Sequence, residues 1–254
     1  MKEKLRLVRT LLEKRNARRK EGRFVVEGPH LVEEAVDQLD FVIYSEQLPL
    51  VSKLADLGVD CYKVSKKQFA EVSDVETPQG ILAVVKQRQF QLSDLFNSVE
   101  PLIVFCVEVQ DPGNLGTIIR TADAVGAAGV VLAKGTVDLY NSKVIRSTMG
   151  SLFHLPIVMV PDTVAAIEQL KKQLVRLIAA DILGSDDYFD VDYIGKTAIL
   201  VGNEGAGLPT NITDLCDQTV KIPMPGRAES LNVGVSTAVV LYEALRQRMR
   251  GRFG

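Results

Sequence analysis

The chain has few of the residues and segments that mark a disulfide-bonded, zinc-binding or membrane protein. Its 254 residues include three cysteines, with no C-x-x-C pair, and only two histidines, His30 and His154. A disulfide framework uses an even number of cysteines and a structural zinc site about four soft ligands, so we expect neither. No apolar run reaches the roughly 18 residues that span a bilayer, and the basic N-terminus lacks the apolar core of a secretory signal. We therefore expect a cytoplasmic protein with no metal and no membrane partner.

The charge of the chain is close to balanced in total but uneven along its length. The formal net charge is −2, yet residues 2–23 hold ten Lys and Arg against three Glu, which leaves about −9 for the remainder. A basic N-terminal segment on an acidic body favours contact with a polyanion. A charged helix face in solvent would give the same pattern, so charge alone leaves both interpretations open.

The periodicity of apolar residues predicts two α/β regions. The first region combines helices over 5–20, 31–36 and 50–57 with strands over 24–27, 41–44, 59–64 and 81–85. The second region has strands over 102–109, 129–132, 157–160, 176–180, 198–201 and 219–222, with helices over 115–125, 141–149, 163–174 and 231–248. Strands that alternate with helices predict a mostly parallel sheet covered on both faces. A polar stretch near residues 87–98 separates the regions, so we predict domains over 1–90 and 98–254.

Three segments of the second region place glycine and asparagine where apolar runs end. They are Asn114-Leu-Gly-Thr-Ile-Ile-Arg120, Val201-Gly-Asn-Glu-Gly-Ala-Gly207 and Ile222-Pro-Met-Pro-Gly-Arg-Ala-Glu-Ser-Leu-Asn-Val233. The ends of parallel strands are where α/β proteins bind ligands, so we expect one composite site. The glycines of the second segment are in the wrong order for a dinucleotide-binding G-x-G-x-x-G. A P-loop at Gly195-Lys-Thr197 is also rejected, because Asp190 replaces its first glycine and a strand follows.

Taken together and in this order, the three segments resemble the motifs of the SpoU (TrmH-like) class of the SPOUT superfamily of RNA methyltransferases. The first motif matches Asn114-x-Gly-x-x-x-Arg120, the second Gly202-Asn-Glu-Gly-x-Gly207, and the third Ile222-Pro-Met224 with Ser230-Leu-Asn-Val233. The basic run at 15–20, the segment Phe24-Val-Val-Glu-Gly28 and Thr77-Pro-Gln-Gly80 resemble the substrate-binding domain that precedes many of these enzymes. The resemblance covers nearly the whole chain.

The resemblance implies a fold and an activity that composition could not show. It implies a C-terminal α/β knot, a deep trefoil knot with a mostly parallel sheet, after a small α/β RNA-binding domain. Such knots are exceptions among proteins. It also implies a homodimer that transfers a methyl group from S-adenosylmethionine (AdoMet) to an RNA ribose 2′-hydroxyl, without a metal. Members with this N-terminal unit often act on large-subunit (23S) ribosomal RNA, which we therefore favour over tRNA.

The resemblance also assigns expected roles to residues of the three motifs. The residues expected to contact AdoMet belong to the second and third motifs, namely Val201, Gly202, Ile222, Met224 and Leu231. The catalytic set is Asn114, Arg120, Glu204, Ser230 and Asn232. A guanidinium stays protonated in proteins, so stabilisation of a developing alkoxide is a better physical role for Arg120 than that of a base. Glu204 should pair with a nearby cation, and Arg120 is the first choice, because a buried carboxylate needs a partner.

Local structure offers alternative explanations for several of these residues. Asn114 or Ser230 could each cap the helix that follows it. Gly202 could simply end a strand, with Ile222 and Leu231 in the core. In the N-terminal region we expect phosphate contacts from a run of four basic residues, Arg15, Arg18, Arg19 and Lys20. Three other functions remain open on sequence alone: a tRNA 2′-O-methyltransferase, a non-catalytic RNA-binding or ribosome-assembly protein, and a dinucleotide oxidoreductase, which the glycine order disfavours.

Overall fold

The computed structural model describes residues 1–253, with side chains up to residue 249, and its contacts divide the chain into two compact units. The first unit comprises Met1–Arg88 together with Asp138–Phe153, and the second comprises Gln89–Val137 together with His154–Gly254. The segment Asp138–Phe153 lies within the predicted second domain by sequence, yet it packs in the first unit. The predicted domains 1–90 and 98–254 therefore do not account for this segment.

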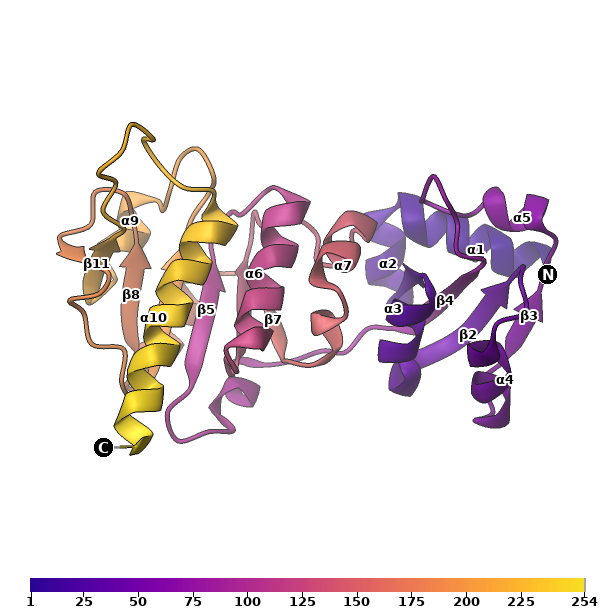
Figure 1. Ribbon diagram of the computed structural model, residues 1–254, viewed down its shortest axis with the longest axis horizontal. Coiled ribbons are helices and arrows are strands. Elements are labelled where there is room, and N and C mark those ends of the chain that lie inside the picture. The colour runs from indigo at the N-terminus through magenta and orange to yellow at the C-terminus, as the bar shows by residue number, and fades with distance from the viewer. Residues whose placement is uncertain (254) are drawn as a thin grey trace. The chain divides into compact units, whose positions relative to one another are not determined.

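The first unit is a four-stranded mixed sheet with helices around it, and its N-terminal segment is drawn in indigo to purple in Figure 1. Its strands follow the order β1-β4-β2-β3, in which only β2 and β3 are parallel. The elements from the N-terminal segment are α1 (Lys2–Glu13), α2 (Arg15–Glu21), β1 (Arg23–Glu27), α3 (Pro29–Glu34), β2 (Leu39–Tyr44), α4 (Pro49–Asp56), β3 (Cys61–Lys63), α5 (Lys66–Ala70) and β4 (Ile81–Lys86). A 3-10 turn, η1 (Val36–Gln38), precedes β2. The later segment adds α7 (Ser142–Thr148) and η3 (Ser151–Phe153), so α7 packs against β1.

The predicted helix over 5–20 is two helices, because the backbone becomes extended at Lys14. Val8 and Leu11 of α1 are fully buried, together with Val25, Ile43 and Val84 of the sheet. The apolar spacing that predicted a helix thus marks the face of α1 that packs on the sheet.

The second unit is a seven-stranded sheet in which every pairing is parallel; the sequence predicted a mostly parallel sheet and six of these strands. Its order is β7-β6-β5-β10-β8-β11-β9. The strands are β5 (Leu102–Cys106), β6 (Gly129–Ala133), β7 (Ile157–Val160), β8 (Arg176–Ala180), β9 (Asp186–Asp187), β10 (Thr197–Val201) and β11 (Gln218–Lys221). The helices are η2 (Leu92–Phe96), α6 (Pro112–Ala124), α8 (Thr163–Lys172), α9 (Thr210–Thr213) and α10 (Val233–Phe253).

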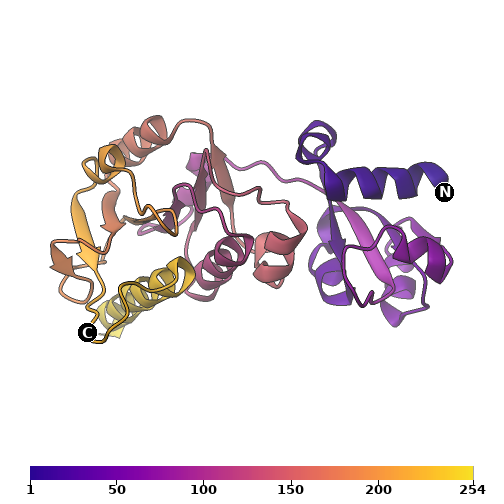
Figure 2. The same cartoon turned by 90° about the horizontal axis from the view of Figure 1, so that it is seen from above.

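Helices cover both faces of this sheet. Figure 2 shows α6 and α10 along one face and α8 and α9 along the other. Alternate strand residues such as Phe105, Val131 and Leu200 pack with Ile167 and Leu170 of α8 in one buried cluster. Burial on both faces explains why these strands read as continuous apolar runs. No helix in the described part of the chain is both long enough and apolar enough to cross a bilayer.

The sheet order brings distant segments together at its carboxyl edge. β10 lies between β5 and β8, although β8 comes before it in the chain. Because all the strands are parallel, the loops after β5, β10, β8 and β11 leave the same edge. The second and third motifs lie in these loops, and the first begins in the first turn of α6, directly after the loop that follows β5. This arrangement explains how residues 90 or more positions apart in the sequence can form one site.

Candidate active site at the carboxyl edge of the sheet

Glu204 follows β10, and its carboxylate is held by donors from the loop after β5. One oxygen accepts hydrogen bonds from the Asp111 amide (2.9 Å) and the Asn114 side-chain Nδ2 (2.9 Å), and the other accepts from the Gln110 amide (3.1 Å). Partial desolvation raises the pKa of Glu204, but these hydrogen bonds outweigh it and lower the pKa below its ordinary value. Glu204 is therefore an ionised clamp that joins the first and second motifs.

Asn114 and Asn232 extend this contact to the third motif. Nδ2 of Asn232 donates to Oδ1 of Asn114 at 2.7 Å. Oδ1 of Asn232 accepts from the amides of Gly234 and Val235, at 2.9 and 3.3 Å, and so caps α10. An ionised carboxylate only accepts hydrogen bonds, so the contact with Glu204 fixes which end of the Asn114 amide faces Asn232. The resulting chain from Glu204 through Asn114 to Asn232, here called the carboxylate–amide network, connects all three motifs.

The structure changes two of the expected local roles. The cap of α6 is Asp111, whose side chain accepts from the Asn114 amide at 2.8 Å, so the alternative that Asn114 caps this helix is wrong. The cap of α10 is Asn232 and not Ser230. The short-range sequence signal was present in Asp111-Pro-Gly-Asn114, since Asp at a cap followed by Pro at the first helical position is a typical helix start.

Arg120 lies on the exposed side of α6. The predicted ion pair between Arg120 and Glu204 is not formed, because Glu204 is engaged by the two backbone amides and Asn114 instead. Among the described residues, no salt bridge to Arg120 is found. Arg120 is thus exposed to solvent on α6, the helix whose first turn contains Asn114 of the carboxylate–amide network.

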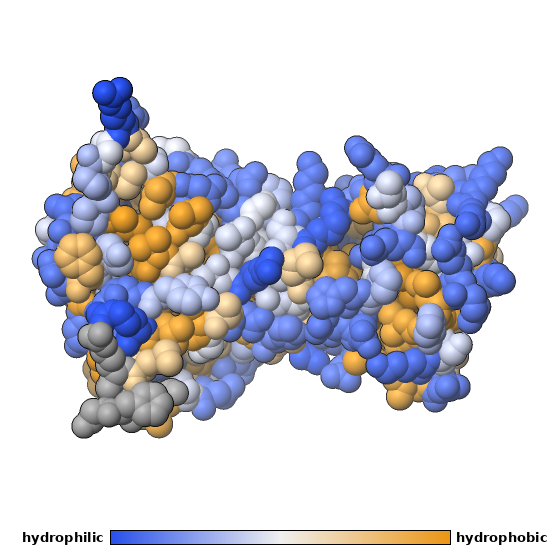
Figure 3. Space-filling model, viewed as in Figure 1, coloured by the Kyte–Doolittle hydropathy of each residue, from blue (hydrophilic) through white to orange (hydrophobic). Residues whose placement is uncertain are grey.

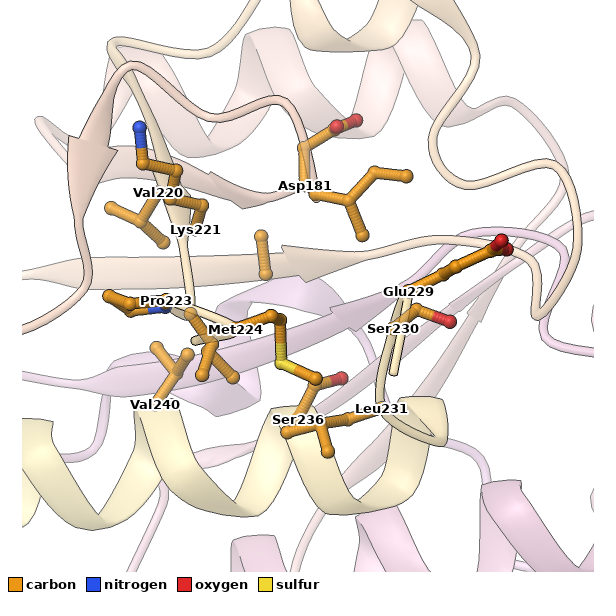
Figure 4. A pocket seen from close by; sticks show the side chains of 13 residues that line it. Asp181, Val220, Lys221, Pro223, Met224, Glu229, Ser230, Leu231, Ser236 and Val240 are labelled. Atoms are coloured by element: carbon orange, nitrogen blue, oxygen red, sulfur yellow. The ribbon is translucent and has the colours of Figure 1, made fainter. Parts of the chain in front are cut away.

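A cavity of about 290 Å³ opens beside this network, between β8, β11 and α10. Ile222, Met224, Leu231 and Ser230 of the third motif line it, four of the residues expected at the site. The remaining lining residues are Ala180, Asp181, Ile182, Val220, Lys221, Pro223, Glu229, Ser236 and Val240. Figure 4 shows Met224, Leu231 and Val240 on one side of the cavity and Asp181 on the other. The cavity is thus lined by both apolar and polar groups, with the apolar ones in excess, which is typical of a small-molecule site.

Val201 and Gly202 are buried and are not among the residues that line the cavity. A Cβ atom at Gly202 would lie 2.2 Å from the carbonyl carbon of Gly207. The close approach arises because Asn203 and Gly207 exchange two backbone hydrogen bonds of 3.0 Å. Glycine at 202 is therefore required by the chain's own loop, and this requirement does not depend on a ligand.

Sequence reasoning missed two residues of this edge. Oδ1 of Asn203 accepts from the amides of Gly205 and Ala206, and its Nδ2 donates to the Glu108 carbonyl at 3.1 Å. Asp181 follows β8 directly and lines the cavity. The signal for Asp181 was its place after the predicted strand over 176–180. In the described residues, no cluster of three or more His, Cys, Asp and Glu side chains is placed to hold a metal ion.

In the first unit, the four predicted phosphate contacts differ in their surroundings. Arg15, Arg19 and Lys20 are exposed on α2, whereas Arg18 is buried. The guanidinium of Arg18 donates to Asp138 at 2.6 and 3.0 Å, and to the carbonyls of Leu11 and Leu12. The prediction that Arg18 contacts phosphate is therefore wrong, because its donors are occupied within the unit.

Comparisons with known proteins agree with this arrangement. Residues 101–242 match the model of the SpoU rRNA Methylase family, and residues 2–83 match that of the MRM3-like substrate binding domain. The chain is 36% identical over 234 residues to the 23S rRNA (guanosine(2553)-2'-O)-methyltransferase RlmP of Bacillus subtilis, covering 91% of this chain and 92% of RlmP. It is also 36% identical over 258 residues to the 23S rRNA (uridine(2479)-2'-O)-methyltransferase of Streptomyces viridochromogenes, covering 95% and 89%.

Solved structures give the same result for the fold. The SpoU methyltransferase AviRb from Streptomyces viridochromogenes, in complex with the cofactor AdoMet, superposes with a TM-score of 0.89 at 33% identity, covering 98% of this chain and 99% of that one. An AdoMet-bound rRNA methyltransferase from Sinorhizobium meliloti superposes with a TM-score of 0.88 at 34% identity, covering 95% and 94%. With the sheet, the network and the family match in agreement, the chain is a member of the SpoU rRNA Methylase family.

Proposed function

We propose that this protein transfers a methyl group from AdoMet to a ribose 2′-hydroxyl of 23S ribosomal RNA. The observation that carries the proposal is the carboxylate–amide network, which links the three motifs next to the cavity. Two relatives that match nearly the whole chain are named as 23S rRNA 2′-O-methyltransferases, which favours this substrate over tRNA. Modification of ribosomal RNA also supports a cytoplasmic location.

The cavity fits the chemistry of AdoMet. The side chains of Ile222, Met224 and Leu231 offer an apolar wall of the kind that accepts an adenine ring, and Asp181 and Ser230 supply polar groups for the rest of the molecule. Val201 and Gly202 support the site by holding the 202–207 loop in shape. When bound, AdoMet supplies an activated methyl group on a sulfonium, so the protein contributes mainly position and electrostatics.

The residues of the network act on the geometry of the transfer. Asn114 has both ends of its amide engaged, so we assign it to fixing the loop after β5 against Glu204 and Asn232. Arg120 is exposed and forms no salt bridge among the described residues, so it is available to the substrate and would stabilise negative charge that develops on the ribose oxygen. Ser230 lies at the cavity margin, where its hydroxyl can bind substrate ribose or phosphate.

RNA binding is assigned to the exposed basic residues of the first unit, with Arg15, Arg19 and Lys20 as phosphate contacts. The match of this unit to a substrate-binding family supports the assignment. Phosphate contacts carry little sequence information, so the choice of nucleotide would come from RNA shape and exposed bases.

We further propose that the protein acts as a homodimer and that its second unit is knotted. An apolar stripe on α10 supports the dimer: Val235, Tyr242 and Met249 are 48%, 53% and 51% exposed. They are seven residues apart and therefore share one helix face. Figure 3 shows apolar surface on the side of the molecule where α10 lies. Light scattering should give twice the 27.9 kDa of one chain, and a mass near one chain would contradict the dimer.

Transfer of labelled methyl groups tests the proposed reaction. Ribosomal RNA and tRNA from cells that lack this protein would be incubated with labelled AdoMet and either the wild type or Arg120→Ala. Alkali-resistant label in 23S RNA with the wild type alone is the expected result. Label in tRNA would identify tRNA as the substrate. AdoMet binding without label on naked RNA would indicate that the substrate is a ribosomal particle. Absence of both label and AdoMet binding would instead favour a non-catalytic RNA-binding protein.

A further inference from the structure

Asp181 is a carboxylate fixed at the wall of the cavity. It follows β8, its amide donates to the Val220 carbonyl at 2.9 Å, and its own carbonyl accepts from the Gly184 amide at 3.1 Å. Its Oδ1 accepts from the Leu183 amide at 2.8 Å. In the part of the chain that the structure describes, no hydrogen bond to Oδ2 is found. One oxygen of a rigidly held carboxylate thus remains available to a ligand.

Two other charged residues line the cavity, but they are held differently. Figure 4 shows the amine of Lys221 and the carboxylates of Glu229 and Asp181 all pointing away from Met224 and Leu231, so direction does not distinguish these three residues. Glu229 is exposed in the loop between β11 and α10. Asp181, by contrast, is half-buried at the end of a sheet strand. Of the two carboxylates that line the cavity, Asp181 is therefore the one whose position is fixed by a hydrogen bond and by partial burial.

We propose that Asp181 is a binding residue that accepts hydrogen bonds from the ribose hydroxyls of AdoMet, an inference that rests on the proposed function. A carboxylate only accepts, which suits a sugar diol, and acidic residues at strand ends bind nucleotide ribose in other parallel sheets. The adenine, on the apolar wall formed by Met224, Leu231 and Val240, would leave its ribose at the opposite, polar side of the cavity.

The sheet order argues for the ribose rather than for the sulfonium or the amino group. The methyl group must face the carboxylate–amide network, which lies after β5 and at the start of α10. Asp181 follows β8, which is separated from β5 by β10. Two strand spacings amount to about 10 Å. The sulfonium is therefore drawn toward the network, and the nucleoside end remains beside Asp181.

Calorimetric binding of three ligands to the full chain tests this assignment. The ligands are AdoMet, S-adenosylhomocysteine, which lacks the sulfonium charge, and methylthioadenosine, which lacks both that charge and the amino acid. Asp181→Asn keeps an oxygen for the Leu183 amide, so the turn should survive. We expect all three affinities to fall by a similar factor of about ten, since hydrogen bonds to a charged acceptor are the stronger kind. Asp190→Asn, which removes an exposed carboxylate outside the cavity, should bind like the wild type.

Each other outcome would overturn the assignment in a distinct way. A loss confined to AdoMet would place Asp181 at the sulfonium, and a loss that spares only methylthioadenosine would place it at the amino-acid end. Unchanged binding would show that it contacts no part of the ligand. As a direct check, 2′-deoxymethylthioadenosine should bind the wild type more weakly than methylthioadenosine, and Asp181→Asn should reduce that difference. A wild type that binds none of these ligands would refute the proposed function itself.

Discussion

Replacing Arg18 should destabilise the first unit although the residue belongs to the most basic segment of the chain. Its side chain and that of Asp138 are 7% and 14% exposed. Nε and Nη2 donate to one oxygen of Asp138, and Nη1 donates to the carbonyls of Leu11 and Leu12 at the end of α1. Arg18→Met would leave these acceptors without their donor while keeping an apolar stem of similar length.

The expected magnitude follows from the burial of the pair. Removing one partner of a buried ion pair costs about 3–5 kcal/mol, because the other charge stays buried and uncompensated. Asp138 keeps some exposure, so we expect the lower end, about 3 kcal/mol. Arg19→Met provides the matched control: it changes the same residue type on the same helix at an exposed position, and should cost about 0.5 kcal/mol or less.

Urea unfolding followed by far-UV circular dichroism would measure the effect, since the chain has no tryptophan. A double variant, Arg18→Met with Asp138→Leu, should recover most of the lost stability, because it removes both charges. Equal stability of Arg18→Met and Arg19→Met would refute the structural role. RNA affinity provides the opposite comparison: Arg19→Met should weaken binding, and folded Arg18→Met should leave it unchanged.

Three further predictions follow from the loops and the basic surface. Gly202→Ala should lower the free energy of unfolding by about 1–3 kcal/mol or prevent folding, because its Cβ would lie 2.2 Å from the Gly207 backbone. Gly205→Ala, where the nearest atom is 3.7 Å away, should be tolerated, and thermal denaturation of both variants would test the difference. The lowered pKa of Glu204 means that its contribution to stability is present above the ordinary carboxyl pKa and is lost as pH falls through the lowered value. The difference in urea midpoint between wild type and Glu204→Gln should therefore be larger at pH 7 than at pH 3, and a constant difference would contradict the clamp. RNA affinity should fall steeply with salt, and the slope of log affinity against log salt concentration should be shallower by about one ion for Arg19→Met than for the wild type. Identical slopes would show that Arg19 does not contact phosphate.

The sequence predicted six of the seven strands of the second unit, most clearly β5, β6 and β10, which are buried throughout and leave continuous apolar runs. It did not predict β9, whose two residues, Asp186 and Asp187, are polar and half-buried. It failed at the end of β5, where the run over 102–109 continues past the strand at Cys106. Val107 still donates to the Val201 carbonyl, but Glu108 adopts a φ of +57° and turns the chain toward Glu204. The apolar pattern records burial, and Val107 and Val109 are buried beside the sheet without extending the strand.

The local pattern also could not assign α7 to a unit. The predicted helix over 141–149 exists as α7, but its neighbours belong to the N-terminal half of the chain. Asp74 pairs with Arg146 of α7 at 3.2 Å and accepts from Ser142, a separation of about 70 residues in sequence. Such contacts depend on tertiary packing and leave no periodic signal. For the same reason, the sequence could not show that Arg18, a residue type usually found at the surface, is buried.

Because of the position of β10 in the sheet, the candidate site forms only when the second unit has folded. β10 pairs with β5 and β8, which both precede it, so a late strand fills the centre of the sheet. Glu204 reaches Asn114 across 90 residues, and Asn232 reaches Asn114 across 118. Contacts of such separation form slowly, because the loop-closure entropy is lost before the contact is gained. The clamp cannot form before β10 is in place, since Glu204 follows that strand. The link from Asn114 to Asn232 and the cavity wall formed by Ser236 and Val240 both require α10 as well. The proposed binding of AdoMet in this cavity therefore requires α10 to be in place, and it would report completion of the second unit.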